Sequence, residues 1–340
     1  MKHGANIYKY AKEICCKADE IIDFSSNINL YQPKNDLVLQ DATIVKYADQ
    51  SYTKLKKTIS QKYSLKTEQI SLFNGASSAI FELFKALKPK KVYLYAPLYG
   101  EYENGLDKDV KIKKINRFEN LLKTPSYNST VVFVNPSTPE GKYYDLKKLF
   151  KIWQKQNCTV ILDESFLEFE ELKSFRKKIN TYKKLYIIQS FSKFYSCAGV
   201  RIGAVFSNKK NLKKFKQPIW NISSLDVEFL TKRLMDKKFE KKSKMLHKKQ
   251  KNELKKILKR FKYIYKSDSN FFLVKCTDKN KLFQHLLNQK ILVRGCGSFD
   301  FLNDEYFRFA VKDKNSHKKL KKALKEYDEY SCRNFCIPDR

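Results

Sequence analysis

Lys193 is the residue whose setting points most directly to chemistry. It stands in the segment Ser190-Phe191-Ser192-Lys193, directly after the apolar run Leu185 to Ser190 that predicts a strand. Burial at a strand end lowers the pKa of a lysine, and a neutral amine can form a Schiff base with a carbonyl compound. Lys and Arg together number 70 in this chain, so the position of Lys193 distinguishes it, and its residue type does not.

A pair of carboxylates, Asp163-Glu164, ends a second apolar run, Thr159 to Leu162. A carboxylate at such a place is costly to desolvate unless it meets a cation or a hydrogen-bond donor. Asp163 is therefore either the partner of a buried cation or an ordinary helix cap or surface turn. The residues alone leave both interpretations open.

Two further features could bind an anion. Asn74-Gly75-Ala76-Ser77-Ser78 precedes the apolar helix expected for Ala79 to Leu87, and free N–H groups at a helix start attract negative charge. The alternative is an ordinary N-cap by Ser77. Arg201 lies within the otherwise apolar run Val200 to Phe206, where a guanidinium needs an anion, and phosphate is the natural partner.

The elements that must position these residues are short apolar runs with room for crossover helices between them. Strands are expected at Lys91 to Ala96, Thr130 to Asn135, Thr159 to Asp163, Leu185 to Ser190 and Val200 to Phe206. The pattern predicts an α/β fold with a mostly parallel sheet, and ligands gather at the carboxyl ends of such strands.

The pattern changes after about residue 210. Residues 225–262 predict one or two long basic helices. After them we expect strands near Phe271 to Lys275, Ile291 to Arg294 and Tyr306 to Val311, and then a closing helix from Ser316 to Tyr327. We therefore expect a large α/β domain over residues 31–225 and a small α+β domain over residues 226–340. Residues 1–30 are expected to form an arm of the small domain that covers the substrate.

The formal charge of +34 suggests a nucleic-acid partner, but the placement of the charge does not. Basic runs such as Asp236 to Lys242 and His317 to Lys322 lie at helical spacing beside apolar residues, which is typical of solvated helix faces. Arg is scarce beside Lys, although recognition of bases and phosphates favours Arg. We expect no nucleic-acid partner, and a positive field that attracts a phosphorylated small substrate.

Other sequence features favour a cytoplasmic protein without a membrane or metal partner. No stretch approaches 18 uncharged apolar residues, and the first residues lack the apolar core of a signal peptide. The eight cysteines, at positions 15, 16, 158, 197, 276, 296, 332 and 336, are scattered and include no C-x-x-C pair.

Together these residues resemble the fold-type I enzymes that use pyridoxal 5′-phosphate (PLP), the aspartate aminotransferase superfamily, over nearly the whole chain. The segments Ser190 to Lys193 and Gly199 to Gly203 are similar to that family's S-x-[ST]-K…G-x-R-x-G signature. The resemblance implies that PLP is the cofactor and that Lys193 carries its aldehyde. The cofactor phosphate would be held by Arg201 and by Ser190 or Ser192.

The same resemblance implies further cofactor contacts. The family's phosphate cup is matched by Gly75, Ala76 and Ser77. Asp163 matches the aspartate that keeps the pyridine nitrogen protonated, which makes the ring an electron sink. Tyr99 matches the aromatic residue that stacks on the ring. Tyr47 matches a tyrosine that reaches the phosphate from the neighbouring subunit, so a homodimer with a shared active site is implied.

Two positions depart from the superfamily pattern. The segment Asn135 to Gly141 resembles N-P-x-N-P-x-G, but Thr138 stands where an asparagine usually bonds the cofactor's O3′. Phe166 stands where a tyrosine often shares that oxygen. A threonine hydroxyl can donate but reaches less far, so we keep Thr138 as a cofactor-binding residue and expect an altered pKa of the Schiff base.

The amino terminus resembles one branch of the superfamily. His3 to Tyr8 and Ile22 to Asn29 are similar to the H-G-G-N-x-Y and D-F-S-x-N-x-N segments of the threonine-phosphate decarboxylases of cobalamin synthesis, close relatives of the histidinol-phosphate aminotransferases. Ala5 replaces the second glycine. This resemblance implies substrate contacts from His3, Asn6 and Asn29.

Arg294 and Arg308 supply the expected anion-binding end of the substrate site. Each lies in a short apolar strand, where an unpaired guanidinium is costly. Salt bridges to Asp or Glu are the alternative. By resemblance, Arg308 binds the substrate carboxylate, and Arg294 with His3 binds the substrate phosphate.

We therefore expect decarboxylation of an O-phospho-L-amino acid, phosphothreonine or phosphoserine, to the amino-alcohol phosphate and CO₂. An aminotransferase on a phosphorylated amino compound is the first alternative, because one rotation about the substrate's Cα separates the two reactions. A basic binding protein that keeps the fold without the chemistry is the second.

Overall fold

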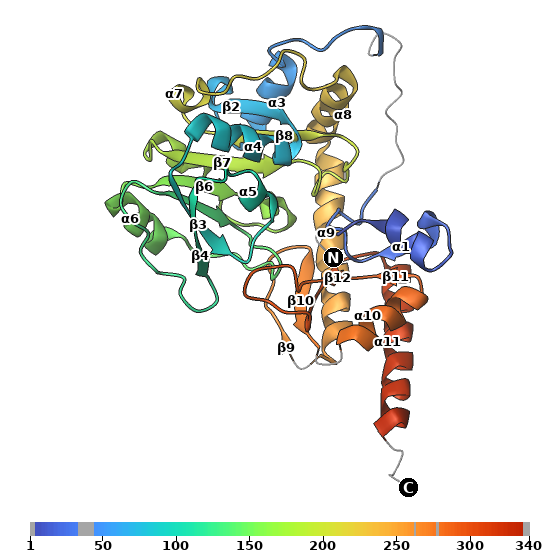
Figure 1. Cartoon of the computed structure of the whole chain (residues 1–340). Coiled ribbons are helices and arrows are strands. Elements are labelled where there is room, and N and C mark those ends of the chain that lie inside the picture. Colours follow the sequence, from blue (N-terminus) through green and yellow to red (C-terminus); the bar gives the residue numbers. More distant parts are fainter. Residues whose placement is uncertain (1–3, 33–43, 262, 277–278, 336–340) are drawn as a thin grey trace.

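The computed structural model describes residues 4–32, 44–261, 263–276 and 279–335 (Figure 1). Its centre is a seven-stranded sheet in the order β2-β8-β7-β6-β5-β3-β4. The strands are β2 (Ile70–Asn74), β3 (Lys91–Ala96), β4 (Lys111–Asn116), β5 (Thr130–Val134), β6 (Thr159–Asp163), β7 (Leu185–Ser190) and β8 (Ile202–Phe206). Strands β4, β3, β5, β6 and β7 are mutually parallel, whereas β8 is antiparallel to both β2 and β7.

Five of the seven strands of this sheet were expected, and most of them have nearly the predicted extent. β3, β6 and β7 have the predicted bounds, and β5 ends one residue early. β2 and β4 were not predicted, because neither has a continuous apolar run. Residues alternate between buried and exposed faces in a strand, and β4 carries lysines on its exposed face.

The prediction for β8 was wrong in its start, and the strand runs antiparallel to its neighbours within the expected mostly parallel sheet. The strand begins at Ile202 and not at Val200, so Arg201 precedes the strand. Gly203 pairs with Ser190 across the antiparallel ladder. The start of β8 therefore lies at the same edge as the carboxyl ends of the parallel strands, which brings Arg201 to the edge where a ligand is expected.

Helices cover both faces of the sheet and bury alternate strand residues. One core packs Tyr95 and Phe133 against Trp153 of α6 (Lys147–Lys155) and also includes residues of α3 (Thr53–Tyr63). The other packs Leu94 against Leu83 of α4 (Gly75–Leu87). This part of the chain also contains two short helices, α5 (Glu101–Asn104) and α7 (Lys209–Leu212).

A second, smaller assembly contains the amino-terminal arm and most residues after 263. Its four-stranded antiparallel sheet has the order β12-β13-β10-β9, from β9 (Tyr263–Ile264), β10 (Phe271–Lys275), β12 (Arg294–Gly295) and β13 (Tyr306–Ala310). In the arm, β1 (Ile22–Asp23) pairs in parallel with β11 (Ile291–Leu292). The arm also carries α1 (Ile7–Glu13), and α10 (Lys279–Asn288) and α11 (Lys314–Phe335) complete the assembly.

Two predictions in this part need correction. The strand expected over Ile291 to Arg294 is two strands in different sheets, because the chain leaves β11 after Leu292 and enters β12 at Arg294. The closing helix is longer than the pattern indicated, since α11 begins at Lys314 and not at Ser316 and continues to Phe335.

The long helix α9 (Lys237–Leu258) joins the two assemblies. Its Phe239 belongs to a core of the seven-stranded sheet, whereas Leu254 and Leu258 belong to the core of the smaller assembly. Figure 1 shows α9 running past both sheets. It follows α8 (Ser224–Met235), which confirms the expected pair of basic helices, and Asp236 caps it by accepting from the Phe239 N–H at 2.8 Å. Among the described residues, no helix combines the length and apolar character needed to span a membrane.

Candidate active site

A cavity of about 600 Å³ lies between the carboxyl edge of the seven-stranded sheet and the smaller assembly. Most of the expected site residues line it. They are Ala76, Ser77, Tyr99, Thr138, Asp163, Ser190, Ser192, Lys193, Arg201, Arg294 and Arg308. The residues from Ala76 to Arg201 meet at the carboxyl edge of the large sheet, and the smaller assembly adds Arg294 and Arg308 from the other side.

Lys193 follows β7 in a turn that the amino-terminal arm holds in place. Asn29 donates its N–H to the Lys193 carbonyl at 2.9 Å and its Nδ2 to the Phe194 carbonyl at 2.7 Å. Burial, and then the positive charges of Arg308 and Arg201, lower the pKa of Lys193 to about 8, although Asp163 opposes the shift. Near neutral pH the neutral fraction of this amine is therefore far larger than that of an ordinary lysine, and the neutral form is the carbonyl nucleophile.

Asp163 lies at the end of β6 and is buried beside the lysine. Its carboxylate accepts hydrogen bonds from Tyr102 Oη at 2.8 Å and from the Ser165 N–H at 2.8 Å. Burial raises the pKa of Asp163, while these hydrogen bonds and Lys193 act in the opposite direction. A protonated pyridine nitrogen would give this desolvated carboxylate the cation that it needs. Tyr102 and Ser165 were not predicted, because their role depends on where the chain places them.

The anion-binding end is built around Gly75, whose φ of +79° suits glycine. A Cβ at Gly75 would lie 2.6 Å from Arg201 Nη2, and one at Gly203 would lie 2.5 Å from the Ala76 nitrogen. The guanidinium and the first turn of α4 therefore approach each other closely. This arrangement fits a phosphate group.

The alternative reading of Ser77 as an ordinary N-cap was wrong. Helix α4 begins at Gly75, and its cap residue Asn74 makes no side-chain cap hydrogen bond. Instead, Asn74 Nδ2 donates to the Asn221 carbonyl at 3.2 Å. The Ser77 hydroxyl lies 3.3 Å from Tyr99 Oη, which joins the expected phosphate cup to the expected ring-stacking residue.

Arg308 is a buried guanidinium on the opposite wall. Its Nη1 donates to Thr138 Oγ1 and its Nη2 to the Ser25 carbonyl, both at 3.0 Å, and its Nε has no hydrogen-bond partner. Its guanidinium lies 5.0 Å from the Phe271 ring centroid. Burial above all lowers the pKa of Arg308 to about 10. Within the described part of the chain no carboxylate forms an ion pair with it, so an anionic ligand is its natural partner.

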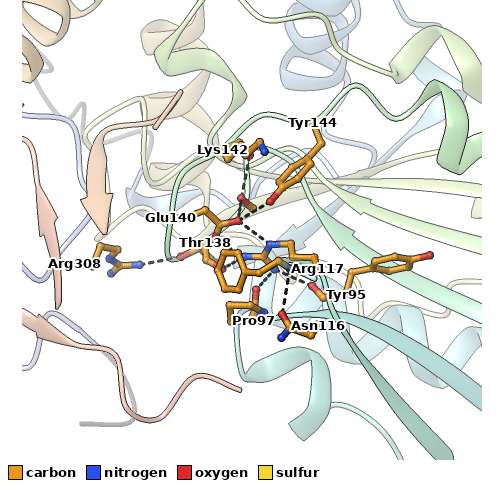
Figure 2. Close-up of polar contacts among 11 residues, drawn as sticks. Tyr95, Pro97, Asn116, Arg117, Thr138, Glu140, Lys142, Tyr144 and Arg308 are labelled. Carbon is orange, nitrogen blue, oxygen red and sulfur yellow. Dashed lines mark hydrogen bonds and ion pairs between the residues drawn. The ribbon is translucent and has the colours of Figure 1, made fainter. Parts of the chain in front are cut away.

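The loop that carries Thr138 rests on a buried ion pair (Figure 2). Arg117 binds Glu140 through Nε at 2.8 Å and Nη2 at 2.5 Å, and the two side chains are almost fully buried. Arg117 also donates to the carbonyls of Tyr95 and Thr138 at 2.9 and 2.8 Å. Figure 2 shows these contacts leading from the sheet edge through Thr138 to Arg308. The pair therefore fixes the hydroxyl that Arg308 contacts.

Several expected residues lie elsewhere. Asn29 holds the backbone of the Lys193 turn and does not line the cavity. Asn6 caps α1 by accepting from the Lys9 N–H at 3.3 Å and does not line the cavity either. Tyr47 is 79% exposed and stacks on Trp220, with ring centroids 4.5 Å apart. His3 lies outside the described residues.

Asn27 is a cavity-lining residue that the sequence interpretation missed. It is buried, and its Oδ1 has no hydrogen-bond partner. It belongs to the same segment as Asn29, which was expected to contact the substrate and does not line the cavity. Phe166 also lines the cavity and packs edge-to-face on Phe271, so this position presents an aromatic ring without a hydroxyl to the site.

Comparisons with known proteins agree with this geometry. A family model for class I and II aminotransferases matches residues 5–326. The chain is 30% identical over 349 residues to the adenosylcobalamin biosynthesis bifunctional protein CobDQ of Leptospira interrogans, a match that covers 94% of this chain and 40% of that protein. The chain therefore spans less than half the length of this relative. Several other relatives are histidinol-phosphate aminotransferases.

Solved structures share the whole fold. The histidinol-phosphate aminotransferase of Clostridium acetobutylicum superposes with a TM-score of 0.82 at 30% identity, covering 90% of this chain and 99% of that one. The L-threonine-O-3-phosphate decarboxylase of Porphyromonas gingivalis superposes with a TM-score of 0.77 at 20% identity, covering 85% and 92%, which is a likeness of fold alone.

The lowered pKa of Lys193 predicts how the protein takes up PLP. Because the neutral amine is the nucleophile, the rate of PLP capture should rise with pH and reach half its maximum near pH 8. Stopped-flow absorbance of apoprotein mixed with PLP measures this rate. Lys193→Ala should show no such phase, and a rate that rises only toward pH 10 would contradict the assignment.

The ion pair predicts a pH-dependent contribution to stability. Burial raises the pKa of Glu140, but Arg117 outweighs it, so the pKa lies below its ordinary value of 4.5. A lowered carboxyl pKa stabilises the fold above the ordinary value, and the contribution is lost as pH falls through the folded value. Glu140→Gln should therefore cost about 3 kcal/mol of unfolding free energy at pH 7 and less at pH 4.

Denaturant unfolding at the two pH values measures this difference. Asp145→Asn is the matched control, because its partner Lys147 is 81% exposed and such pairs contribute about 1 kcal/mol or less. An equal effect of the two substitutions would contradict a structural role for the Arg117–Glu140 pair.

Proposed function

The chain belongs to the class I and II aminotransferase family, and we propose that it decarboxylates an O-phospho-L-amino acid, phosphothreonine or phosphoserine, to the amino-alcohol phosphate and CO₂. The observation that carries the proposal is the pairing of two arginines, Arg308 and Arg294, across one cavity from Lys193. A substrate with both a carboxylate and a phosphate needs two cationic groups.

The family is PLP-dependent, and the residues of this cavity fit that cofactor. Lys193 provides the amine, Asp163 the buried carboxylate for the ring nitrogen, and Arg201 with the first turn of α4 the phosphate site. When bound, PLP withdraws electrons from the substrate's Cα and stabilises the charge left when a bond perpendicular to its ring breaks. A binding protein without chemistry does not explain these residues.

In the proposed reaction the arginines decide which bond breaks. Arg308, fixed by Thr138 and Ser25, binds the carboxylate, and Arg294 binds the phosphate at the other end of the substrate. Holding both ends would set the rotation about Cα, and a decarboxylase needs the rotation that presents the Cα–carboxylate bond for cleavage. Orientation of this kind contributes to the rate without any change in the chemistry.

The amino-terminal segment supports the decarboxylase over its alternative. Ser25, Ser26 and Asn27, within the segment that resembles the decarboxylases, line the cavity, and the Ser25 carbonyl holds Arg308. The similarity to the adenosylcobalamin biosynthesis protein agrees with this branch. The 30% identity to a histidinol-phosphate aminotransferase favours the second candidate, an aminotransferase on a phosphorylated amine.

We also propose that the protein works as a homodimer. Tyr47 lies outside its own cavity and is 79% exposed, as a residue that serves the neighbouring subunit would be. The structure contains a single chain, so sedimentation of the PLP-loaded protein is the direct measurement.

The two candidate functions differ in their products. PLP-loaded protein should release CO₂ from phosphothreonine or phosphoserine at a rate that does not depend on 2-oxoglutarate. If glutamate accumulates with 2-oxoglutarate and no CO₂ appears, the aminotransferase is the correct assignment. The relative rates on the two substrates identify the preferred one, although a single methyl group gives only ~1–3 kcal/mol of discrimination.

The substitution Arg294→Ala should lower the activity on phosphorylated substrates only. Loss of a charge-assisted partner in a desolvated site costs at least about 2 kcal/mol, so kcat/KM for the phosphorylated substrate should fall about 30-fold or more. The corresponding value for unphosphorylated threonine or serine should change little. An equal loss on both kinds of substrate would show that Arg294 does not bind the phosphate.

A further inference from the structure

The mouth of the cavity carries an ion-pair network that the proposed reaction does not use. Lys114 Nζ lies 2.7 Å from Glu103 Oε2 and 2.8 Å from Asp300 Oδ1, and all three residues line the cavity. Lys114 lies in β4 of the large sheet and Glu103 in the helix α5, whereas Asp300 lies between β12 and β13 of the smaller sheet. The network therefore connects the two walls of the cavity.

Asp300 belongs to the turn that holds Arg294. In this turn the Phe299 N–H donates to the Cys296 carbonyl at 3.0 Å. Ser298 Oγ accepts from Arg294 Nη2 at 3.0 Å, and the Phe299 ring centroid lies 5.2 Å from the guanidinium. The two residues before Asp300 thus contact the arginine that we assign to the substrate phosphate.

We propose that Lys114 is a positioning residue for the phosphate end of the substrate site. Through Asp300 it anchors the turn whose Ser298 and Phe299 direct Arg294 toward the cavity. This inference rests on the proposed function, and it adds a residue of the large sheet to a phosphate end that Arg294, Ser298 and Phe299 of the smaller assembly form. Arg294 comes from a two-residue strand, so its direction depends on the turn beside it.

Direct binding of the substrate phosphate by Lys114 is the competing explanation. Two carboxylates already surround the single ammonium group, so an arriving phosphate would meet a net negative charge. The side chains are 28%, 45% and 36% exposed for Lys114, Glu103 and Asp300. A partly exposed pair contributes modest free energy, which fits a residue that orients another.

A double-mutant cycle separates these explanations. The variants are Lys114→Met, Asp300→Asn and the double variant, with Lys114→Arg as the rescue. Lys113→Met is the matched control, because it removes the same charge from an exposed neighbour on β4. Each PLP-loaded variant is tested for KM and kcat on the phosphorylated substrate and for the Kd of inorganic phosphate by calorimetry.

The proposal predicts that Lys114→Met and Asp300→Asn each raise KM and the phosphate Kd about 5-fold, with kcat nearly unchanged. The double variant should be no worse than either single one, because both substitutions break the same contact. Lys114→Arg should recover most of the affinity, and Lys113→Met should match the wild type.

Three results would overturn the proposal. If Lys114→Met raises the Kd of inorganic phosphate and Asp300→Asn lowers it, Lys114 binds the phosphate directly. Additive losses would show that the two residues act separately. Wild-type values in every variant would show that the network has no role in substrate binding.

The phosphate Kd keeps this test separate from the proposed function. If Arg294→Ala binds inorganic phosphate as well as the wild type does, Arg294 is not the phosphate ligand and the proposed function loses its support. If the Arg294→Ala variant no longer binds inorganic phosphate but the Lys114→Met variant binds it as the wild type does, only the positioning role of Lys114 is wrong.

Discussion

The constraint on which this structure depends is the burial of one lysine amine among like charges. Lys193 shares its cavity with Arg201 and Arg308, whose charges add to the effect of burial on its pKa. Among the groups that shift the pKa of Lys193, only the buried carboxylate of Asp163 raises it. An anion-rich ligand that also reacts with an amine resolves the excess of positive charge, and a phosphorylated aldehyde has both properties.

The fold meets this constraint by bringing distant segments to one edge. Lys193, Asp163 and Thr138 follow parallel strands, and the reversed direction of β8 adds Arg201 at the same edge. The amino-terminal arm completes the site from the other side, because Asn29 holds the lysine turn and Ser25 holds Arg308. The helix α9 links the two assemblies, so the cavity lies between cores that pack on a common element.

The sequence predicted the parts of this arrangement that local patterns determine. Buried apolar runs located β3, β6 and β7 at their bounds, and the resemblance to a known family identified most of the residues that line the cavity. The edge strand β4 could not be found, because alternate lysines conceal its pattern. The direction of β8 could not be read either, since direction depends on which strands pair and not on local composition.

Residues whose role depends on long-range contacts were also missed. Nothing near Arg117 or Glu140 in the sequence shows that they pair beneath Thr138. The segment Asp23 to Asn29 was recognised, yet its pattern could not show that Asn27 lines the cavity while Asn29 bonds to the backbone. Such distinctions follow from the path of the chain, which a sequence pattern does not fix.

We expect Lys193, and no other lysine of this basic chain, to bind the cofactor. Borohydride reduction of the PLP-loaded protein fixes the cofactor to its lysine, and peptide mass spectrometry then locates the attached group. One modified peptide is expected, with the pyridoxyl group on Lys193 and one group per chain. Attachment to a different lysine, or attachment spread over many lysines, would contradict it.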